Sequence, residues 1–422
     1  MSLQGPILVV AAKPAGELAQ AFGSAGAFPV IEACWADARS AAAEIKPSAI
    51  VVGQPDAAEI NAAAVLARET AKAVPFLPII ARVAEEAASA LPDALPIADD
   101  APVERLIARV AGALRLRALH AAVLGRARTL KSERNIVAEM PVGDPLDDAT
   151  VLLIGRGRHH ATLSVAVGER MGVMGALSVD AAARCLTARE IDGVVVGEGL
   201  PNGSAEVFLS LLAQDHRFRD LPVAVLGGGD ADALSNFVCA RDPHLLLERA
   251  VPLIRLHAFE ATLKRLLKSI ECKGMIDAQT GLLNVKAFGQ QLSRAIEDAG
   301  ERSVGLSLAR FSFEGEIDRR TSLDAARLVC RLLRGADFAC RQDDGSVLFA
   351  FADTDLRAAH VVARRLASVL KHTMLRPDRA RPYERPDDRP GVSPSVTLAT
   401  LKPSDTVLTL LARVSPRPVA AA

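Results

Sequence analysis

The first part of the chain contains one pattern twice at a constant spacing. The matched apolar segments are ILVV (7–10) with VLLI (151–154), AIVVG (49–53) with GVVVG (193–197), and LPIIA (77–81) with LPVAV (221–225). All three pairs are offset by 144 residues, and a later pair of helical segments, starting at Arg109 and Arg249, is offset by 140. One offset shared by three segments indicates an internal repeat. The sequence therefore predicts two copies of one folding unit.

Each copy alternates short apolar runs with Ala- and Leu-rich segments. The apolar runs lack polar alternation, which predicts strands buried on both faces of a parallel sheet covered by helices. This succession indicates a doubly wound α/β domain. Each copy ends in a long amphipathic helix, through ERLIARVAGALRLRALHAAVLGRARTLKSE in the first and ATLKRLLKSIE in the second. The Pro-, Gly- and Asp-rich link EMPVGDPLDDA (139–149) separates the copies.

Composition excludes several classes of protein. The 422 residues are 50% hydrophobic, which suits about three domains of ~150 residues each, and the net charge of zero gives no overall field for nucleic acid. No apolar run approaches the ~18 residues that span a membrane. A strand-like run, PILVV (6–10), lies close to the N-terminus, so we expect no signal peptide. Six scattered cysteines without a CxxC pair predict no zinc site and a reducing cytoplasm.

The repeated unit resembles the flavodoxin-like receiver domain of two-component response regulators. That resemblance implies an acidic pair after strand one to hold Mg²⁺, an aspartate ending strand three as phosphoacceptor, a Ser or Thr after strand four, and a Lys after strand five. Both copies hold other residues there: Ala11, Ala12, Lys13, Gly155 and Arg156 after strand one; Gly53 and Gly197 ending strand three; Ala81, Arg82 and Gly227 after strand four; and Arg241 after strand five of the second copy. Both copies are predicted to be pseudo-receivers without metal or phosphoacceptor.

Asp56 is the alternative phosphoacceptor. It lies three residues past the expected position, so it could accept a phosphoryl group only in a shifted strand register. The other interpretation is a solvated loop aspartate after Pro55. The absence of the metal-binding acids favours the loop interpretation, because the carboxylates that would hold Mg²⁺ are missing.

From Met275 the sequence changes to an α+β pattern. Predicted elements are a helix after the turn at 277–281, a strand at 304–313, a helix at 322–333, two strands around a turn at Asp343, the helix LRAAHVVARRLASVL, a strand at 395–401 and a short helix. Two motifs, Asp277-x-x-Thr280-Gly-Leu-Leu-Asn284 and Arg334-x-x-Asp337-x-x-x-Arg341, resemble the nucleotidyl-cyclase-like GGDEF domain of diguanylate cyclases. The expected layout is a pseudo-receiver at 1–138, a second at 149–270 and a degenerate GGDEF domain at 273–415.

The turn that gives the GGDEF family its name is altered in this chain. The family has two glycines, which let a guanine nucleotide approach the backbone, and then two carboxylates that bind metal. Here the five positions hold Asp343, Asp344, Gly345, Ser346 and Val347, and the metal-binding aspartate of the preceding strand falls at Arg310 or Ala309. Two metal ions are needed to neutralise charge in such a reaction. We expect no cyclase activity, no catalytic residue and no bound metal.

A second site of the family is marked by Arg-x-x-Asp ahead of the turn, where cyclic di-GMP inhibits many of these enzymes. Arg334 and Asp337 occupy that register. An arginine fork suits phosphate or a guanine edge. The resemblance implies that Asp337 accepts from guanine and that the next helix supplies a second arginine, Arg365 or its neighbour Arg364. The alternative is a helix-terminal arginine and an ordinary turn aspartate.

The resemblance implies a non-catalytic cyclic di-GMP receptor in bacterial signalling that acts through protein contacts. It further implies an adaptor in cell-cycle and proteolysis control, with client or signalling proteins as partners, a polar position in the cytoplasm, and a homodimer formed through the receiver domains. The alternatives are a nucleotide-independent dimeric scaffold and an active diguanylate cyclase. The segment RPDRARPYERPDDRP (376–390) predicts a disordered loop, with a partner-docking arm as the alternative.

Overall fold

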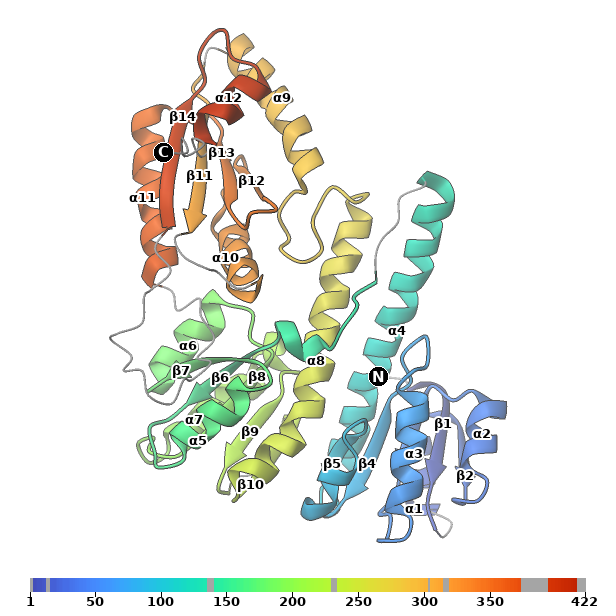
Figure 1. The fold of residues 1–422 in the computed structure, drawn as a ribbon. Helices are drawn as coiled ribbons and strands as arrows, with labels where there is room; N and C mark the ends of the chain where they lie inside the picture. The colour runs from blue at the N-terminus through green and yellow to red at the C-terminus, as the bar shows by residue number, and fades with distance from the viewer. Residues whose placement is uncertain are drawn as a thin grey trace, which may run out of the picture. The chain divides into compact units, whose positions relative to one another are not determined.

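The computed structural model describes residues 3–12, 16–134, 140–228, 234–302, 304–313, 319–372 and 394–415. The chain divides into two compact units, which are described separately (Figure 1). The first unit holds Met1–Arg128 and Pro141–Lys264 and contains two parallel sheets. The second unit contains an antiparallel sheet. The segment predicted as a loop or docking arm, 376–390, lies outside the described residues.

The first sheet has five parallel strands. These are β1 (Gln4–Val10), β2 (Phe28–Ala33), β3 (Ala49–Val52), β4 (Ile79–Val83) and β5 (Leu95–Ala98), in the order β2-β1-β3-β4-β5. Its helices are α1 (Gly16–Ser24), α2 (Ala38–Ile45), α3 (Ile60–Thr70), the 3-10 helix η1 (Glu85–Ala90) and α4 (Val103–Arg134). Val51 packs in a core with α1 and α4, whereas Ile50 and Val52 pack in a core with α3. Helices therefore cover both faces, as continuous apolar strands require.

The second sheet repeats this arrangement. Its strands are β6 (Thr150–Ile154), β7 (Gly172–Ala176), β8 (Gly193–Val196), β9 (Val223–Leu226) and β10 (Phe237–Ala240), in the order β10-β9-β8-β6-β7. Its helices are η2 (Pro145–Asp148), α5 (His160–Gly168), α6 (Val179–Ala188), α7 (Ser204–Gln214), η3 (His216–Phe218) and α8 (Pro243–Glu271). Both sheets thus have the strand order 2-1-3-4-5 of flavodoxin-like folds.

The repeat found in the sequence is a repeat in the structure. The three segment pairs offset by 144 residues supply β1 and β6, β3 and β8, and β4 and β9, which hold equivalent places in the two sheets. The prediction of parallel-sheet α/β folding is confirmed. One position was wrong: Ala81 and Arg82 lie inside β4 and not after it, because buried Val83 extends the strand and makes Ala84 the next residue.

The two repeats share one hydrophobic core. Leu106 and Val110 of α4 belong to the same buried cluster as Leu246 and Ile254 of α8. Polar contacts cross the same boundary, since Arg115 of α4 donates to Asp220 of the second repeat at 2.8 Å. The long helices α4 and α8, which end the two repeats, therefore pack in one shared core. The two repeats form one unit.

The second unit is built on an antiparallel sheet. Its strands are β11 (Ser307–Phe313), β12 (Phe338–Arg341), β13 (Val347–Phe351) and β14 (Pro394–Thr400), in the order β12-β13-β11-β14, and its helices are α9 (Val285–Arg302), α10 (Arg319–Leu332), α11 (Leu356–His372) and α12 (Val407–Val414). One face of the sheet packs on α10 and α11, and the other packs on α9 and α12. This agrees with the predicted α+β pattern. Among the described residues, no helix joins the length to the apolar character that crossing a bilayer requires.

Candidate functional site

Arg334 and Asp337 lie in the turn that joins α10 to β12. The turn is closed by the Asp337 N–H, which donates to the Arg334 carbonyl at 3.0 Å. Asp337 is half-buried, and one of its carboxylate oxygens accepts from the N–H of Ala352, just after β13, at 3.3 Å. Arg334 is exposed, and its guanidinium makes no hydrogen bond within the part of the chain that the structure describes. The turn thus fixes the aspartate and leaves the arginine available to a ligand.

The environment of Asp337 raises the pKa of its carboxyl group. Burial raises the pKa of this carboxyl above its ordinary value, although the Ala352 hydrogen bond and the charge of Arg334 act in the opposite direction. A ligand N–H that donated to the carboxylate would lower that pKa again, because hydrogen bonds to the charged form favour it. The site can therefore accept a paired donor and, at Arg334, donate to an anion.

Arg365 lies on the exposed side of α11, as does Arg364. It comes nine residues after Leu356, which places it about 14 Å along the helix axis at ~1.5 Å per residue. In the described residues neither arginine forms a hydrogen bond or ion pair with Arg334 or Asp337. The structure brings Arg334 and Asp337 together and leaves Arg365 unconnected to them.

The altered signature turn is a tight hairpin between β12 and β13. The N–H of Gln342 donates to the Ser346 carbonyl at 2.8 Å, and the N–H of Gly345 donates to the Gln342 carbonyl at 3.0 Å. Gly345 has a φ of +80°, which side chains rarely adopt, and a Cβ there would lie 3.2 Å from Oγ of Ser322. The glycine at this signature position is therefore required by the turn itself.

Arg310 holds the position at which the resemblance implied a metal-binding aspartate. Arg310 of β11 forms an ion pair with Asp344 of the turn, and Asp344 also accepts from the Ser346 N–H at 3.0 Å and hydroxyl at 2.6 Å. The Arg310 side chain is 11% exposed and that of Asp344 is 53% exposed. Ala309 is buried in the core on the other face, so Arg310 is the residue that faces the turn.

Ser346 and Arg310 together lower the pKa of Asp344. Burial pushes the pKa of Asp344 upward, but hydrogen bonds from Ser346 and the charge of Arg310 hold it below its usual range. Asp343 next to it is exposed. Across the described residues, no group of three or more His, Cys, Asp or Glu side chains is placed to hold a metal ion. Asp344 is thus held by Arg310 and Ser346, and the two positions after it, Gly345 and Ser346, carry no carboxylate.

Four further motif residues have structural roles. Arg341 donates from Nε to Oγ of Ser322 at 2.8 Å, which ties the hairpin to α10. In the other motif, the Thr280 hydroxyl donates to Asp277 at 2.6 Å, and Asn284 accepts from the Ala287 N–H at 2.7 Å at the start of α9. These contacts explain the motifs as turn and cap chemistry.

Glycine or arginine directly follows several strands of the first unit. Gly53 and Gly197 directly follow β3 and β8, Gly227 follows β9, and Arg241 follows β10. Asp56 accepts the N–H groups of Ala58 and Glu59 at 2.8 and 2.9 Å, and Glu59 in turn accepts the Asp56 N–H at 3.0 Å. This reciprocal pair is a capping box at the turn that leads into α3. The capping role accounts for Asp56 without phosphoryl chemistry.

Sequence reasoning missed a group of arginines in the first unit. Arg105 of α4 and Arg249 of α8 each act electrostatically on Arg109 of α4, which is only 2% exposed. The one signal in the sequence was the pair of helical segments that begin at Arg109 and Arg249. That signal marks the repeat and gives no indication that the two segments meet.

No protein-family model and no curated protein matches the sequence. Among solved structures, the chain is similar to the coiled coil and GGDEF domain of DgcB from Caulobacter crescentus in complex with c-di-GMP, at 18% identity over 36% of this chain and 82% of that chain, with a TM-score of 0.29. It is similar to the GGDEF domain of FimX from Pseudomonas aeruginosa, at 17% identity over 33% and 88%, with a TM-score of 0.28.

A third similar structure is the diguanylate cyclase SiaD in complex with its activator SiaC from Pseudomonas aeruginosa. The identity is 16% over 36% of this chain and 60% of that chain, with a TM-score of 0.29. Identities and TM-scores this low do not establish membership of a family.

Proposed function

We propose that this chain is a non-catalytic receptor for cyclic di-GMP that acts through contacts with other proteins. The observation that carries the proposal is the contrast between two turns of the second unit. The signature turn holds its carboxylate against Arg310, whereas the turn before β12 presents an exposed arginine beside a half-buried aspartate. A domain that had lost synthesis and kept ligand binding would have this arrangement.

The absence of catalysis follows from the charges of the signature turn. Joining two GTP molecules requires metal ions that neutralise charge on the α-phosphates. In this hairpin the positions of the family's two acids are Gly345 and Ser346, and a metal would face the guanidinium of Arg310. We therefore expect that the chain forms no cyclic di-GMP from GTP with Mg²⁺ or Mn²⁺.

Ligand recognition is assigned to Arg334 and Asp337. The planar guanidinium can donate two parallel hydrogen bonds to a phosphate or to the acceptor edge of guanine. The Asp337 carboxylate keeps acceptor capacity beyond its one backbone donor, so it can accept from the guanine N–H groups. Arg365 is proposed as a second cationic contact, with Arg364 as the alternative.

The first unit is proposed to be a pair of pseudo-receivers that present the protein to its partners. Its strand order is that of the flavodoxin-like fold, and Gly53 and Gly197 stand where the resemblance implies a phosphoacceptor. Client or signalling proteins in cell-cycle and proteolysis control, at a pole of the cytoplasm, are the partners that the resemblance implies. A homodimer through this unit would use surfaces other than those of α4 and α8 that form the shared core.

A nucleotide-independent scaffold is the second candidate. It is favoured by the shared core of the two repeats, which joins them in one compact unit. The two candidates differ in one property, the affinity of the second unit for cyclic di-GMP.

Calorimetric titration of the full chain with cyclic di-GMP separates the candidates. Arg334→Ala should weaken binding at least about tenfold, because a hydrogen bond to a charged group contributes roughly 1.5–3 kcal/mol. Arg334→Lys should not restore it, because an ammonium lacks the planar fork. Arg294→Ala, a change at an exposed arginine of α9, is the matched control and should bind like the wild type. No heat from the wild type at high micromolar ligand would leave the scaffold as the function.

A further inference from the structure

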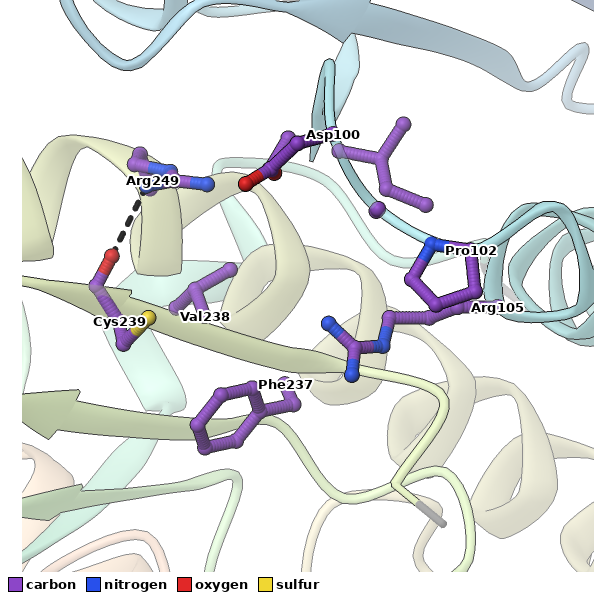
Figure 2. Close-up of a pocket in the computed structure, with 10 residues that line it drawn as sticks. Asp100, Pro102, Arg105, Phe237, Val238, Cys239 and Arg249 are labelled. Atoms are coloured by element: carbon purple, nitrogen blue, oxygen red, sulfur yellow. Dashed lines mark hydrogen bonds between the residues drawn. The ribbon is translucent and has the colours of Figure 1, made fainter. Parts of the chain in front are cut away.

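A cavity lies between the two repeats of the first unit. Its volume is about 360 Å³, and it is lined by the end of β5 and the start of α4 from one repeat and by β10 and α8 from the other. Figure 2 shows Arg105 and Arg249 reaching toward this space from α4 and α8, with Asp100 and Phe237 beside it. Ligand pockets in proteins start at roughly 300 Å³, so this cavity has the size for a small molecule.

Positive charge is concentrated around the cavity. Behind its lining lies Arg109, whose guanidinium donates to the carbonyls of Pro96, Ser235 and Phe237 and so bridges the two repeats. Burial and the charges of Arg105 and Arg249 lower the pKa of Arg109 to about 9. The charges of Arg105 and Arg249 thus both act on Arg109, and the described lining contains one carboxylate, that of exposed Asp100.

The two arginines of the lining are held in place before any ligand arrives. Arg249 donates to the Cys239 carbonyl at 2.9 Å, and the Arg105 guanidinium lies over the Phe237 ring at 5.7 Å from its centroid. A guanidinium fixed in this way loses little conformational entropy when it binds an anion. Its planar fork matches the oxygens of a phosphate group. Phe237 and Val238 add apolar surface for an uncharged part of the same ligand.

We propose that this cavity binds a small phosphate monoester, about the size of a nucleoside monophosphate, with Arg105 and Arg249 as its phosphate contacts. The ligand touches both repeats, so its binding stabilises their packing. This goes beyond the proposed function, because cyclic di-GMP is assigned to Arg334 and Asp337 in the other unit.

The test uses GMP as the probe, with guanosine and inorganic phosphate as separate arms. Thermal unfolding of the full chain is followed by the fluorescence of Trp35, the only tryptophan, which lies in the first repeat, and affinity is measured by calorimetry. GMP should raise the unfolding temperature, inorganic phosphate should do so more weakly, and guanosine should have no effect. Arg105→Gln should weaken GMP binding at least about tenfold.

A second variant tests the proposal in the opposite direction. Asp100→Asn removes the carboxylate of the lining and should tighten GMP binding. This variant still tests the cavity if Arg105→Gln does not fold. Arg128→Gln, at an exposed position further along α4, and Arg334→Ala in the other unit should bind GMP like the wild type. The proposal is overturned if GMP and guanosine act alike, if Asp100→Asn does not tighten binding, or if folded Arg105→Gln binds GMP unchanged.

Discussion

Arg310 and Asp344 form an ion pair that links β11 to the turn between β12 and β13. The side chain of Arg310 is largely buried, whereas that of Asp344 is half exposed. The Nε of Arg310 is buried without a hydrogen-bond partner among the described residues, so the guanidinium depends on Asp344. Replacing one partner alone should therefore reduce stability by more than the loss of an ion pair between two exposed side chains would.

Asp344→Ala should lower the local stability of the hairpin by about 1–2 kcal/mol, because it leaves the mostly buried Arg310 unpaired. This value is smaller than the cost of breaking a fully buried ion pair, because Asp344 itself is half exposed and solvent screens its charge. The measurement is hydrogen exchange at the amides of β12 and β13. Asp343→Ala, at the exposed neighbour, is the control and should change exchange by less than ~0.5 kcal/mol. Equal effects of the two substitutions would show that the pair contributes nothing.

The same pair predicts a pH dependence. The folded-state pKa of Asp344 lies below its ordinary value, so its contribution is present above the unfolded-state pKa of about 4 and is lost as the pH falls through the folded-state pKa. The difference in hydrogen exchange between wild type and Asp344→Asn should be constant near neutral pH and disappear in acid. A difference that grows as the pH falls would contradict this.

At the scale of elements, the hairpin also shows what the sequence could and could not reveal. The strands around Asp343 were predictable because their apolar runs are interrupted by turn residues. The choice between Arg310 and Ala309 was not, because adjacent strand residues face opposite sides of the sheet and only the pairing of β11 with β13 decides which one meets the turn. The sequence also placed the end of β4 too early, because the length of a strand depends on packing that the sequence alone does not show.

Gly345→Ala should destabilise the hairpin by roughly 1–2 kcal/mol, because φ is +80° there and the new Cβ would lie 3.2 Å from Ser322 Oγ. Gly335→Ala is the matched control: it adds the same methyl group in the turn between Arg334 and Asp337, where a Cβ meets nothing within 4 Å. Hydrogen exchange at β12 and β13 reports both. Similar exchange in the two variants would mean that Gly345 is not required by the turn.

At the scale of the whole molecule, the repeat made the first unit predictable, since one spacing linked three strands. The meeting of the two repeats could not be predicted, because Arg109 contacts the second repeat across 126 and 128 residues of sequence. The same holds for the two turns of the second unit, whose roles depend on which side chains tertiary packing leaves exposed. We propose that the turn at Arg334 and Asp337 binds the ligand and that the turn at Asp343 and Asp344 no longer supports synthesis.

The most direct test of that separation is a calorimetric titration of the Asp343→Ala/Asp344→Ala variant with cyclic di-GMP, beside Asp337→Ala. The first variant changes the signature turn and should bind with the affinity of the wild type, because Arg334 and Asp337 are untouched. Asp337→Ala should bind more weakly, because it loses the acceptor for the guanine N–H groups. If the signature-turn variant lost binding while Asp337→Ala kept it, the ligand would lie at the signature turn and the central claim would be wrong.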